Sequence, residues 1–181
     1  MRTLTYCMNL SLDGYVSGTP APGPELHQWF NDRLREAELE LYGRRMWDLM
    51  SGYWPTADQQ PDATSVEADF AQVWRDTPKV VFSSTLSAVS GNARLHAGDA
   101  LAEIRRLKAE DGGSMAISGA TLAGAAIRAG LVDEYALITH PVLLGGGAPF
   151  FPPLESRLDL RHVETLTFPE GVVMTRYATR A

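Results

Sequence analysis

The chain has 181 residues, of which 45% are hydrophobic and 21% charged, and its formal net charge is −6. This length suits one buried core, so we expect a single domain over residues 1–181. The negative charge argues against general binding to nucleic acids or anionic membranes, which needs clustered cations. The lone Cys7 excludes an intramolecular disulfide, and no secretory segment is recognised near the start, so a cytoplasmic location is expected.

The first half of the chain alternates strand and helix patterns, separated by turn signals such as Asp13-Gly14. Apolar residues at a spacing of three to four predict helices, and short β-branched runs predict strands. The predicted elements are, in order, a strand over 3–12, a helix over 25–38, a strand over 39–42, a helix to about Met50, a helix over 66–75 and a strand over 79–82.

The second half continues this alternation and ends differently. The predicted elements are a helix over 98–109, a strand over 115–117, a helix over 121–129, a strand over 132–141 that 142–144 extend, and a hairpin formed by 158–168 and 172–179. This order predicts an α/β fold with a mixed, mostly parallel central sheet, flanking helices and a C-terminal antiparallel hairpin.

The segment Tyr42-Gly43-Arg44-Arg45 places two adjacent guanidinium groups directly after a short strand. A strand that passes through such a turn into a helix directs backbone N–H groups and positive charge at one spot, which suits a phosphate. Arginines at a helix start otherwise oppose the helix dipole, at a cost of roughly a few tenths of a kcal/mol. The composition alone is equally compatible with an ordinary helix start at which the two arginines are solvated and bind no ligand.

A second strand-to-helix junction lies at Ser118-Gly119-Ala120-Thr121. Gly119 and Gly124 have the spacing of a P-loop, but Ala125-Ala126 replace its Lys-Ser/Thr pair, so NTP hydrolysis is not expected. The Rossmann pattern Gly-x-Gly-x-x-Gly is absent as well. What is left is a turn of small residues whose N–H groups could hold a pyrophosphate. Two such junctions in one small α/β chain predict a nucleotide cofactor with phosphates.

Hydroxyl side chains follow the strand over 79–82, at Ser83-Ser84-Thr85. Ligands of α/β sheets gather outside the carboxyl ends of strands, so these residues are candidates for ligand contacts. A helix cap or a Ser/Thr turn explains them equally well.

Several other chemistries find no support in the sequence. The histidines His27, His96, His140 and His162 are far apart and form no zinc-ligand spacing, so no metal site is expected. The Gly-x-Ser-x-Gly elbow of α/β-hydrolases is absent. Asp13 is better explained as part of an Asp-Gly turn than as a general acid.

Taken in order, these segments resemble the dihydrofolate reductase superfamily. They resemble most closely the branch that contains the reductase domain of the riboflavin-biosynthesis deaminase/reductases (the RibD C-terminal domain) and many small stand-alone relatives. The resemblance implies one domain that binds NADPH and reduces a C=O or C=N group of a small, heterocyclic or sugar-bearing substrate. The matching segments cover most of the chain, at residues 8–16, 42–47, 80–85, 117–122, 130–135 and 140–145.

The resemblance also implies roles for individual residues, and all of them lie in the segments marked above. The implied contacts are the backbone near Asn9 and Val16 for the nicotinamide carboxamide; Gly43, Arg44, Arg45 and Met46 for the pyrophosphate or the 2′-phosphate; Ser83, Ser84 and Thr85 for the adenosine ribose and its phosphate; and Ser118, Gly119, Ala120, Thr121 and Leu122 for the other flank of the phosphates.

The substrate side departs from true dihydrofolate reductases. The first helix lacks their Trp-x-x-Pro-x-Asp-like segment, whose carboxylate binds the pterin, so folate reduction is not expected. Glu25, His27 and Asp32 are the candidate proton donors beside water. Tyr53 and Trp54 are candidates for stacking on the substrate, although a loop packed on the core is an equally good explanation.

Two other functions stay open at this point. The first helix lacks the carboxylate segment of true dihydrofolate reductases, and this would fit a catalytically silent dinucleotide-binding module, which would bind the cofactor without turnover. A dimeric scaffold with a vestigial pocket would not bind it at all. The resemblance also implies a homodimer.

Overall fold

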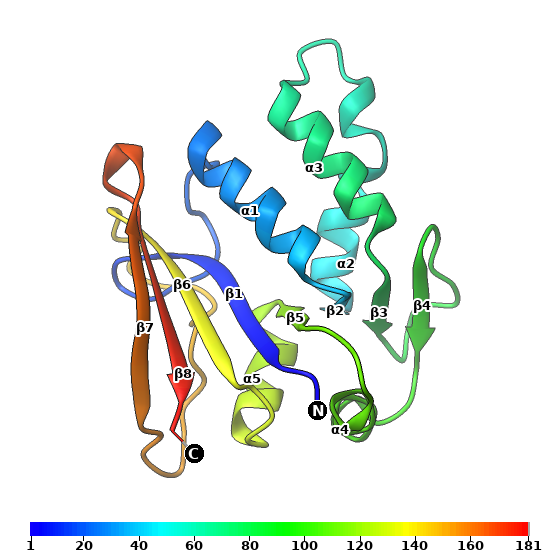
Figure 1. Cartoon of the computed structure of the whole chain (residues 1–181), viewed down its shortest axis with the longest axis vertical. Helices are drawn as coiled ribbons and strands as arrows, with labels where there is room; N and C mark the ends of the chain where they lie inside the picture. The colour runs from blue at the N-terminus through cyan, green and yellow to red at the C-terminus, as the bar shows by residue number, and fades with distance from the viewer. Residues whose placement is uncertain (181) are drawn as a thin grey trace.

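The computed structural model describes residues 1–180. In this part of the chain, eight strands form one sheet in the order β4-β3-β2-β5-β1-β6-β8-β7 (Figure 1). The strands are β1 (Leu4–Ser11), β2 (Leu39–Gly43), β3 (Lys79–Phe82), β4 (Ala93–His96), β5 (Met115–Ser118), β6 (Glu134–His140), β7 (Leu160–Thr167) and β8 (Val173–Thr179). The helices are α1 (Pro24–Glu36), α2 (Arg44–Ser51), α3 (Ser65–Asp76), α4 (Ala100–Ala109) and α5 (Ala120–Arg128), with the 3₁₀ helices η1 (Trp54–Gln59) and η2 (Pro169–Gly171).

Six strands of the sheet, from β4 to β6 in spatial order, pair in parallel. Strand β8 runs antiparallel to β6, and β7 runs antiparallel to β8. The predicted fold class is therefore confirmed. In a parallel sheet the carboxyl ends of the strands meet at one edge, which is where α/β proteins bind their ligands.

Helices cover both faces of the sheet because successive side chains of a strand point to opposite faces. Leu41 of β2 lies in one buried cluster with Ile104 of α4 and Ile127 of α5. Its neighbour Tyr42 belongs to a second cluster with Trp74 of α3, whose indole N–H donates to the Tyr42 hydroxyl oxygen at 3.2 Å. Helices α1 and α3 are seen on that side of the sheet in Figure 1.

The structure differs from the sequence expectations in two places. Strand β4 was not predicted; it has only four residues, and none of them is fully buried. Residues 142–144, expected to extend a strand, form none. There the Asp13 carboxylate accepts hydrogen bonds from the backbone N–H groups of Leu144 (3.1 Å) and Gly145 (2.7 Å), which holds this segment as a loop beside the Asp-Gly turn.

A glutamate and a lysine are buried as register partners in the middle of the sheet. Glu40 of β2 is 7% exposed and Lys79 of β3 is 3% exposed. The Lys79 ammonium group donates to the backbone carbonyls of Trp74 and Thr77, and so caps the C-terminal end of α3. Burial raises the pKa of Glu40 to about 7, against the opposing influence of the Lys79 charge. The Lys79 pKa is lowered to about 8, again mainly by burial.

We expect Glu40→Gln to remove a pH dependence of stability. The pKa of Glu40 is about 7 in the folded protein and 4.5 for the ordinary group, so between these values the folded state binds more protons than the unfolded state. The contribution of Glu40 to the free energy of unfolding therefore falls as the pH rises through this window, by about 3 kcal/mol in total. Urea unfolding at about pH 5 and about pH 8 measures this change.

The matched control is Glu155→Gln, because Glu155 is an exposed carboxylate. This control should show the same pH dependence as the unchanged protein. A Glu40→Gln variant whose stability also falls by about 3 kcal/mol between the two pH values would show that Glu40 is not the titrating group.

Candidate functional site

Two strand-to-helix junctions face each other at the carboxyl edge of the sheet. Strand β2 passes into α2 at Gly43 and β5 passes into α5 at Gly119, so each glycine is a helix N-cap. A Cβ atom on Gly43 would lie 3.5 Å from Cβ of Leu122 in α5, and one on Gly119 would lie 3.3 Å from Cβ of Met46 in α2. Each junction therefore contacts the helix that begins at the other. Gly119 also has a φ of 98°, a conformation that side chains disfavour.

A cavity of about 780 Å³ opens at these junctions. Both helices direct the N–H groups of their first turn, with partial positive charge, to this edge of the sheet. The lining contains two arginines and no carboxylate, so the cavity suits an anion. The lining residues are Met8, Val16, Ser17, Gly43, Arg44, Arg45, Met46, Leu49, Phe82, Ser83, Ser84, Thr85, Ala97, Gly98, Ala100, Gly119, Ala120, Thr121, Leu122, Ala125 and Ala148.

The two arginines differ in their contacts. Arg44 donates from Nη1 to Oγ1 of Thr85 at 2.5 Å and from Nε to the Asp48 carboxylate at 3.4 Å. Ser83 holds the same turn, because its Oγ accepts the N–H of Thr85 at 3.2 Å. Arg45 is exposed, and within residues 1–180 its side chain has neither a hydrogen bond nor an ion pair. Arg44 therefore ties α2 to the end of β3, while the Arg45 charge is available to a ligand.

A gap in the sheet lies beside this cavity. The register pairs of β1 with β5 end at Tyr6 and Ile117, whereas the pairs of β1 with β6 continue to Ser11. The Thr3 carbonyl oxygen accepts the N–H of Met115 in β5 at 2.8 Å, and the Leu4 carbonyl oxygen accepts the N–H of Asp133, the residue before β6, at 2.9 Å. Successive residues of β1 therefore direct their backbone groups alternately to the two neighbouring strands. By this alternation, the N–H and C=O groups of Asn9 point to the side on which β5 has already ended.

The loop after β1 closes the far end of this gap. Ser11 is fully buried, and its Oγ accepts the N–H of Tyr15 at 3.0 Å. Next along the chain, the N–H of Val16 donates to the carbonyl of Ala148 at 2.9 Å, and Tyr15 forms a β-bridge with Pro149. Val16 and Ala148 are thereby placed in the lining, next to the opening in the sheet.

Nearly all predicted cofactor contacts lie around this one cavity. Asn9 and Ser118 are not in the lining, but their neighbours Met8 and Gly119 are. The role of these residues as cofactor ligands stays a prediction. Those that line the cavity are Val16, Gly43, Arg44, Arg45, Met46, Ser83, Ser84, Thr85, Gly119, Ala120, Thr121 and Leu122.

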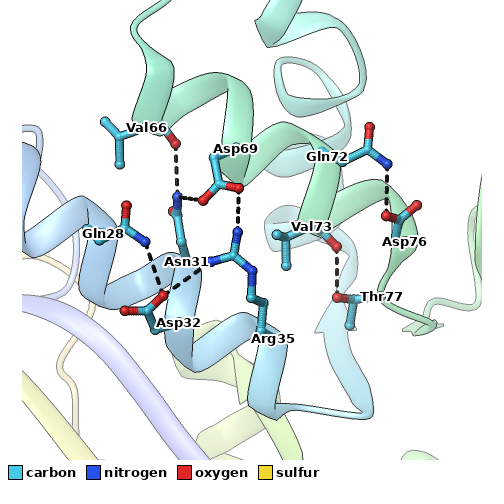
Figure 2. Close-up of polar contacts among 10 residues, drawn as sticks. All are labelled: Gln28, Asn31, Asp32, Arg35, Val66, Asp69, Gln72, Val73, Asp76 and Thr77. Atoms are coloured by element: carbon cyan, nitrogen blue, oxygen red, sulfur yellow. Dashed lines mark hydrogen bonds and ion pairs between the residues drawn. The ribbon is translucent and has the colours of Figure 1, made fainter.

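The candidate proton donors lie on α1, away from the lining. Glu25 is exposed in the first turn of the helix. His27 is 8% exposed and packs between aromatic rings, 5.4 Å from Phe70, and burial lowers its pKa. Asp32 is exposed, and Figure 2 shows it bonded within its own helix, where it accepts hydrogen bonds from Gln28 and Arg35 at 3.1 Å each. None of the three lies in the cavity lining, and their role as proton donors stays a prediction.

The candidate substrate residues also lie outside the lining. Trp54 packs on Phe70 with ring centroids 4.2 Å apart and lies 5.6 Å from His27. Tyr53 is 43% exposed and contacts the edge of the Trp54 ring. Trp54 is thus part of the packing between α1, η1 and α3, which leaves Tyr53 as the more accessible of the two.

Sequence reasoning missed part of the lining. Ala97 and Gly98 follow β4, the strand that was not predicted, so their position at the carboxyl edge was hidden. Ala148 is placed at the cavity by the hydrogen bond that its carbonyl accepts from the N–H of Val16, a residue far from it in the sequence. The missed residues are mostly small or apolar and carry no chemical signature: Met8, Ser17, Leu49, Phe82, Ala97, Gly98, Ala100, Ala125 and Ala148.

Residues 1–180 lack the features of two other kinds of site. No helix in this range has the length and apolar character needed to cross a bilayer. Nor do three His, Cys, Asp or Glu side chains gather there as metal ligands would. Burial raises the pKa of the Cys7 thiol to about 12, so this thiol stays protonated and unreactive at neutral pH.

Two sequence comparisons test the resemblance to a known family. A profile of the family described as RibD C-terminal domain matches residues 2–174. The uncharacterized protein YyaP of Bacillus subtilis (strain 168) is 32% identical over 183 residues, which cover 97% of this chain and 94% of that protein. These matches confirm the resemblance drawn from the sequence motifs.

Two solved structures share the fold. A protein of Shewanella sp. PV-4, named for riboflavin biosynthesis, superposes with a TM-score of 0.73 at 21% identity and 99% coverage of both chains. Dihydrofolate reductase from Enterococcus faecalis, in a complex with NADP(H) and RAB-propyl, superposes with a TM-score of 0.65 at 14% identity, over 99% of this chain and 97% of that one. At these identities the likeness establishes a dihydrofolate-reductase-like fold.

We expect Gly119→Ala to destabilise the protein by about 1–3 kcal/mol, because a side chain at positive φ is strained and its Cβ would press on Met46. Gly130→Ala is the matched control: Gly130 also has positive φ (67°), but a Cβ there would meet no atom within 4 Å. Urea unfolding should therefore show a larger loss for Gly119→Ala. Equal losses would mean that the approach of α2 to this junction is not tight.

Proposed function

Since the chain belongs to the RibD C-terminal domain family, we propose that it is an NADPH-dependent reductase. Its substrate would be a small molecule with a C=O or C=N group, heterocyclic or sugar-bearing. The riboflavin-biosynthesis name of the Shewanella relative supports this choice of substrate class.

The observation that carries this proposal is the meeting of two helix N-termini around one cavity without carboxylates. A dinucleotide needs donors for several phosphates along an extended groove, and the first turns of α2 and α5 provide them from opposite sides. The cavity volume of about 780 Å³ is within the range of cofactor sites. Gly119 itself has no side chain to cover the backbone N–H groups at the start of α5, as a pyrophosphate requires.

In the proposed arrangement, each end of NADPH has its own set of residues. The Asn9 backbone groups, which point into the gap beside β1, would bind the nicotinamide carboxamide, with Val16 across the gap. Residues 119–122 at the start of α5 would hold the pyrophosphate. Arg45, and Arg44 with the hydroxyl groups of residues 83–85, would hold the adenosine ribose and its 2′-phosphate.

When bound, NADPH supplies a hydride from C4 to the electrophilic carbon, the π electron pair of the C=O or C=N group moves to its oxygen or nitrogen, and that atom takes a proton from water. The chain itself supplies position: strand β1 and the loop at Val16 would fix the ring at the end of the sheet. Holding the two reacting carbons about 3–3.5 Å apart accounts for much of the acceleration.

Replacing both Arg44 and Arg45 by Ala should weaken NADPH binding by roughly a hundredfold or more, and NADH binding much less. The reason is that each guanidinium–phosphate pair is a charge-assisted hydrogen bond, worth about 1.5–3 kcal/mol, and NADH lacks the 2′-phosphate. Titration of tryptophan emission measures both affinities, because Trp47 lies in α2 beside the two arginines. Arg128→Ala, at the far end of α5, is the control. Equal losses for NADPH and NADH would refute the 2′-phosphate contact.

Turnover separates a reductase from a silent binding module. The purified protein should oxidise NADPH when offered phenanthrenequinone, an aromatic dicarbonyl, or a cyclic imine, and NADPH absorbance follows the reaction. The double arginine variant should lose this activity at low NADPH and regain it when NADPH is raised, because its defect is in binding. Tight NADPH binding with no oxidation by any acceptor would favour the silent module.

A further inference from the structure

We propose that the side chain of Asn9 donates a hydrogen bond to the oxygen or nitrogen atom of the group being reduced, and that His140 positions it. This inference rests on the proposed reductase function and adds the residue that would recognise the substrate. It assigns a catalytic role to Asn9, beyond its backbone contacts, and a positioning role to His140.

The two side chains are joined directly although they are 131 residues apart. His140 is the last residue of β6, and Asn9 precedes the end of the adjacent parallel strand β1. The Nε2 atom of His140 lies 2.8 Å from Oδ1 of Asn9. A carboxamide oxygen can only accept, so Nε2 of the imidazole carries the proton and donates. This bond fixes which way the Asn9 carboxamide is turned.

His140 is built into the sheet and is not a surface residue. It is 2% exposed, and its register partner Ser11 is fully buried. Burial lowers the pKa of His140, against the opposing influence of the Glu170 charge, so the ring is neutral at neutral pH. A buried polar ring without a partner would be costly, and the bond to Asn9 gives it one. The pair is therefore held firmly in place.

The bond to His140 leaves the amide group of Asn9 as an unused donor. Asn9 is partly exposed, and within residues 1–180 its Nδ2 has no hydrogen-bond partner. Its side chain points to the α1 face of the sheet, since its register partner Ile138 packs there with Leu26 of α1. Leu26 and Ile138 thus present apolar surface on this side of the donor, which strengthens a single directed hydrogen bond.

The position of Asn9 links this donor to the reacting group. Its neighbour Met8 lines the cavity, and the backbone groups of Asn9 itself point into the gap between β1 and the end of β5. A nicotinamide held by this backbone would have the Asn9 amide beside it, on the α1 face. The substrate would have to approach there, because the rest of the cofactor occupies the cavity on the other side.

The chemistry fits an amide donor. When a hydride adds to the carbon of a C=O or C=N group, the electron pair moves to the oxygen or nitrogen, which becomes more basic and holds a hydrogen bond more strongly than in the ground state. Asn9 would stabilise that charge, and water would deliver the proton. A neutral donor in apolar surroundings selects an uncharged acceptor group over a carboxylate or a phosphate at this point.

Single-turnover oxidation of NADPH by phenanthrenequinone tests Asn9. Asn9→Ala keeps the backbone, so NADPH affinity from tryptophan emission should change by less than about twofold, while the hydride-transfer rate should fall by about a hundredfold, as for the loss of one oxyanion donor. A rate within about twofold of the unchanged protein would overturn the inference and leave the proposed function standing. Failure of the unchanged protein to bind or oxidise NADPH would overturn both.

Two substitutions test the positioning role. His140→Leu should lower the rate about tenfold, the equivalent of one neutral hydrogen bond, and His140→Gln should restore most of it, because the Gln amide can donate from nearly the same place. His162→Leu is the matched control, since His162 is bonded to Thr165 at 2.7 Å on the exposed strand β7. Equal rates for the Leu and Gln variants at position 140 would overturn the positioning role.

A measurement without turnover checks the pair itself. Long-range ¹H–¹⁵N spectra of the histidine rings should show the Nε2–H tautomer for His140 in the unchanged protein, and a shift of that nitrogen in Asn9→Ala, with His162 unaffected. A His140 ring that is insensitive to Asn9→Ala would mean that the two side chains are not bonded in solution, and would overturn the assignment.

Discussion

The structure depends on the point at which β1 parts from β5. Up to Tyr6 the two strands are paired, and beyond it β1 continues alone beside β6. Backbone groups that lose a strand partner inside a sheet need another one, because leaving them unpaired costs free energy. Part of the gap is filled by the loop at Tyr15, which bonds to Ser11. The remainder, at Asn9, is where we propose that the nicotinamide carboxamide binds, and the cofactor would then complete the sheet.

Charge is distributed to suit this arrangement. The chain as a whole is acidic, with a net charge of −6, yet the cavity lining has two arginines and no carboxylate. Arg44 is held by Thr85 and Asp48, and so stabilises the wall of the cavity, whereas Arg45 has no partner within residues 1–180. The partial charges of two helix N-termini add to them. A local field of this kind attracts a phosphate group without making the whole surface cationic.

The α1 face is stabilised by polar contacts that keep the helix in one place. Figure 2 shows Asn31 and Arg35 of α1 reaching α3, where the Asn31 amide donates to the Val66 carbonyl at 3.0 Å and to the Asp69 carboxylate at 2.7 Å. The end of α3 is capped in turn by the buried Lys79. If the substrate lies between α1 and Asn9, as we infer, these contacts set the width of its site, although none of them touches it.

The amino-acid sequence by itself determined the local elements, because strand and helix patterns repeat over a few residues and glycine and arginine mark turns. It therefore predicted the α/β fold and the two junctions at Gly43 and Gly119, and the order of these segments gave the resemblance to the family. Tertiary structure alone decided which elements became neighbours. The parallel register of β1 with β6 joins Asn9 to His140, and a loop contact brings Ala148 to Val16. The orientation of α1, whose Asn31 bonds to Asp69 of α3, is likewise set by packing, and no pattern within a single segment records it.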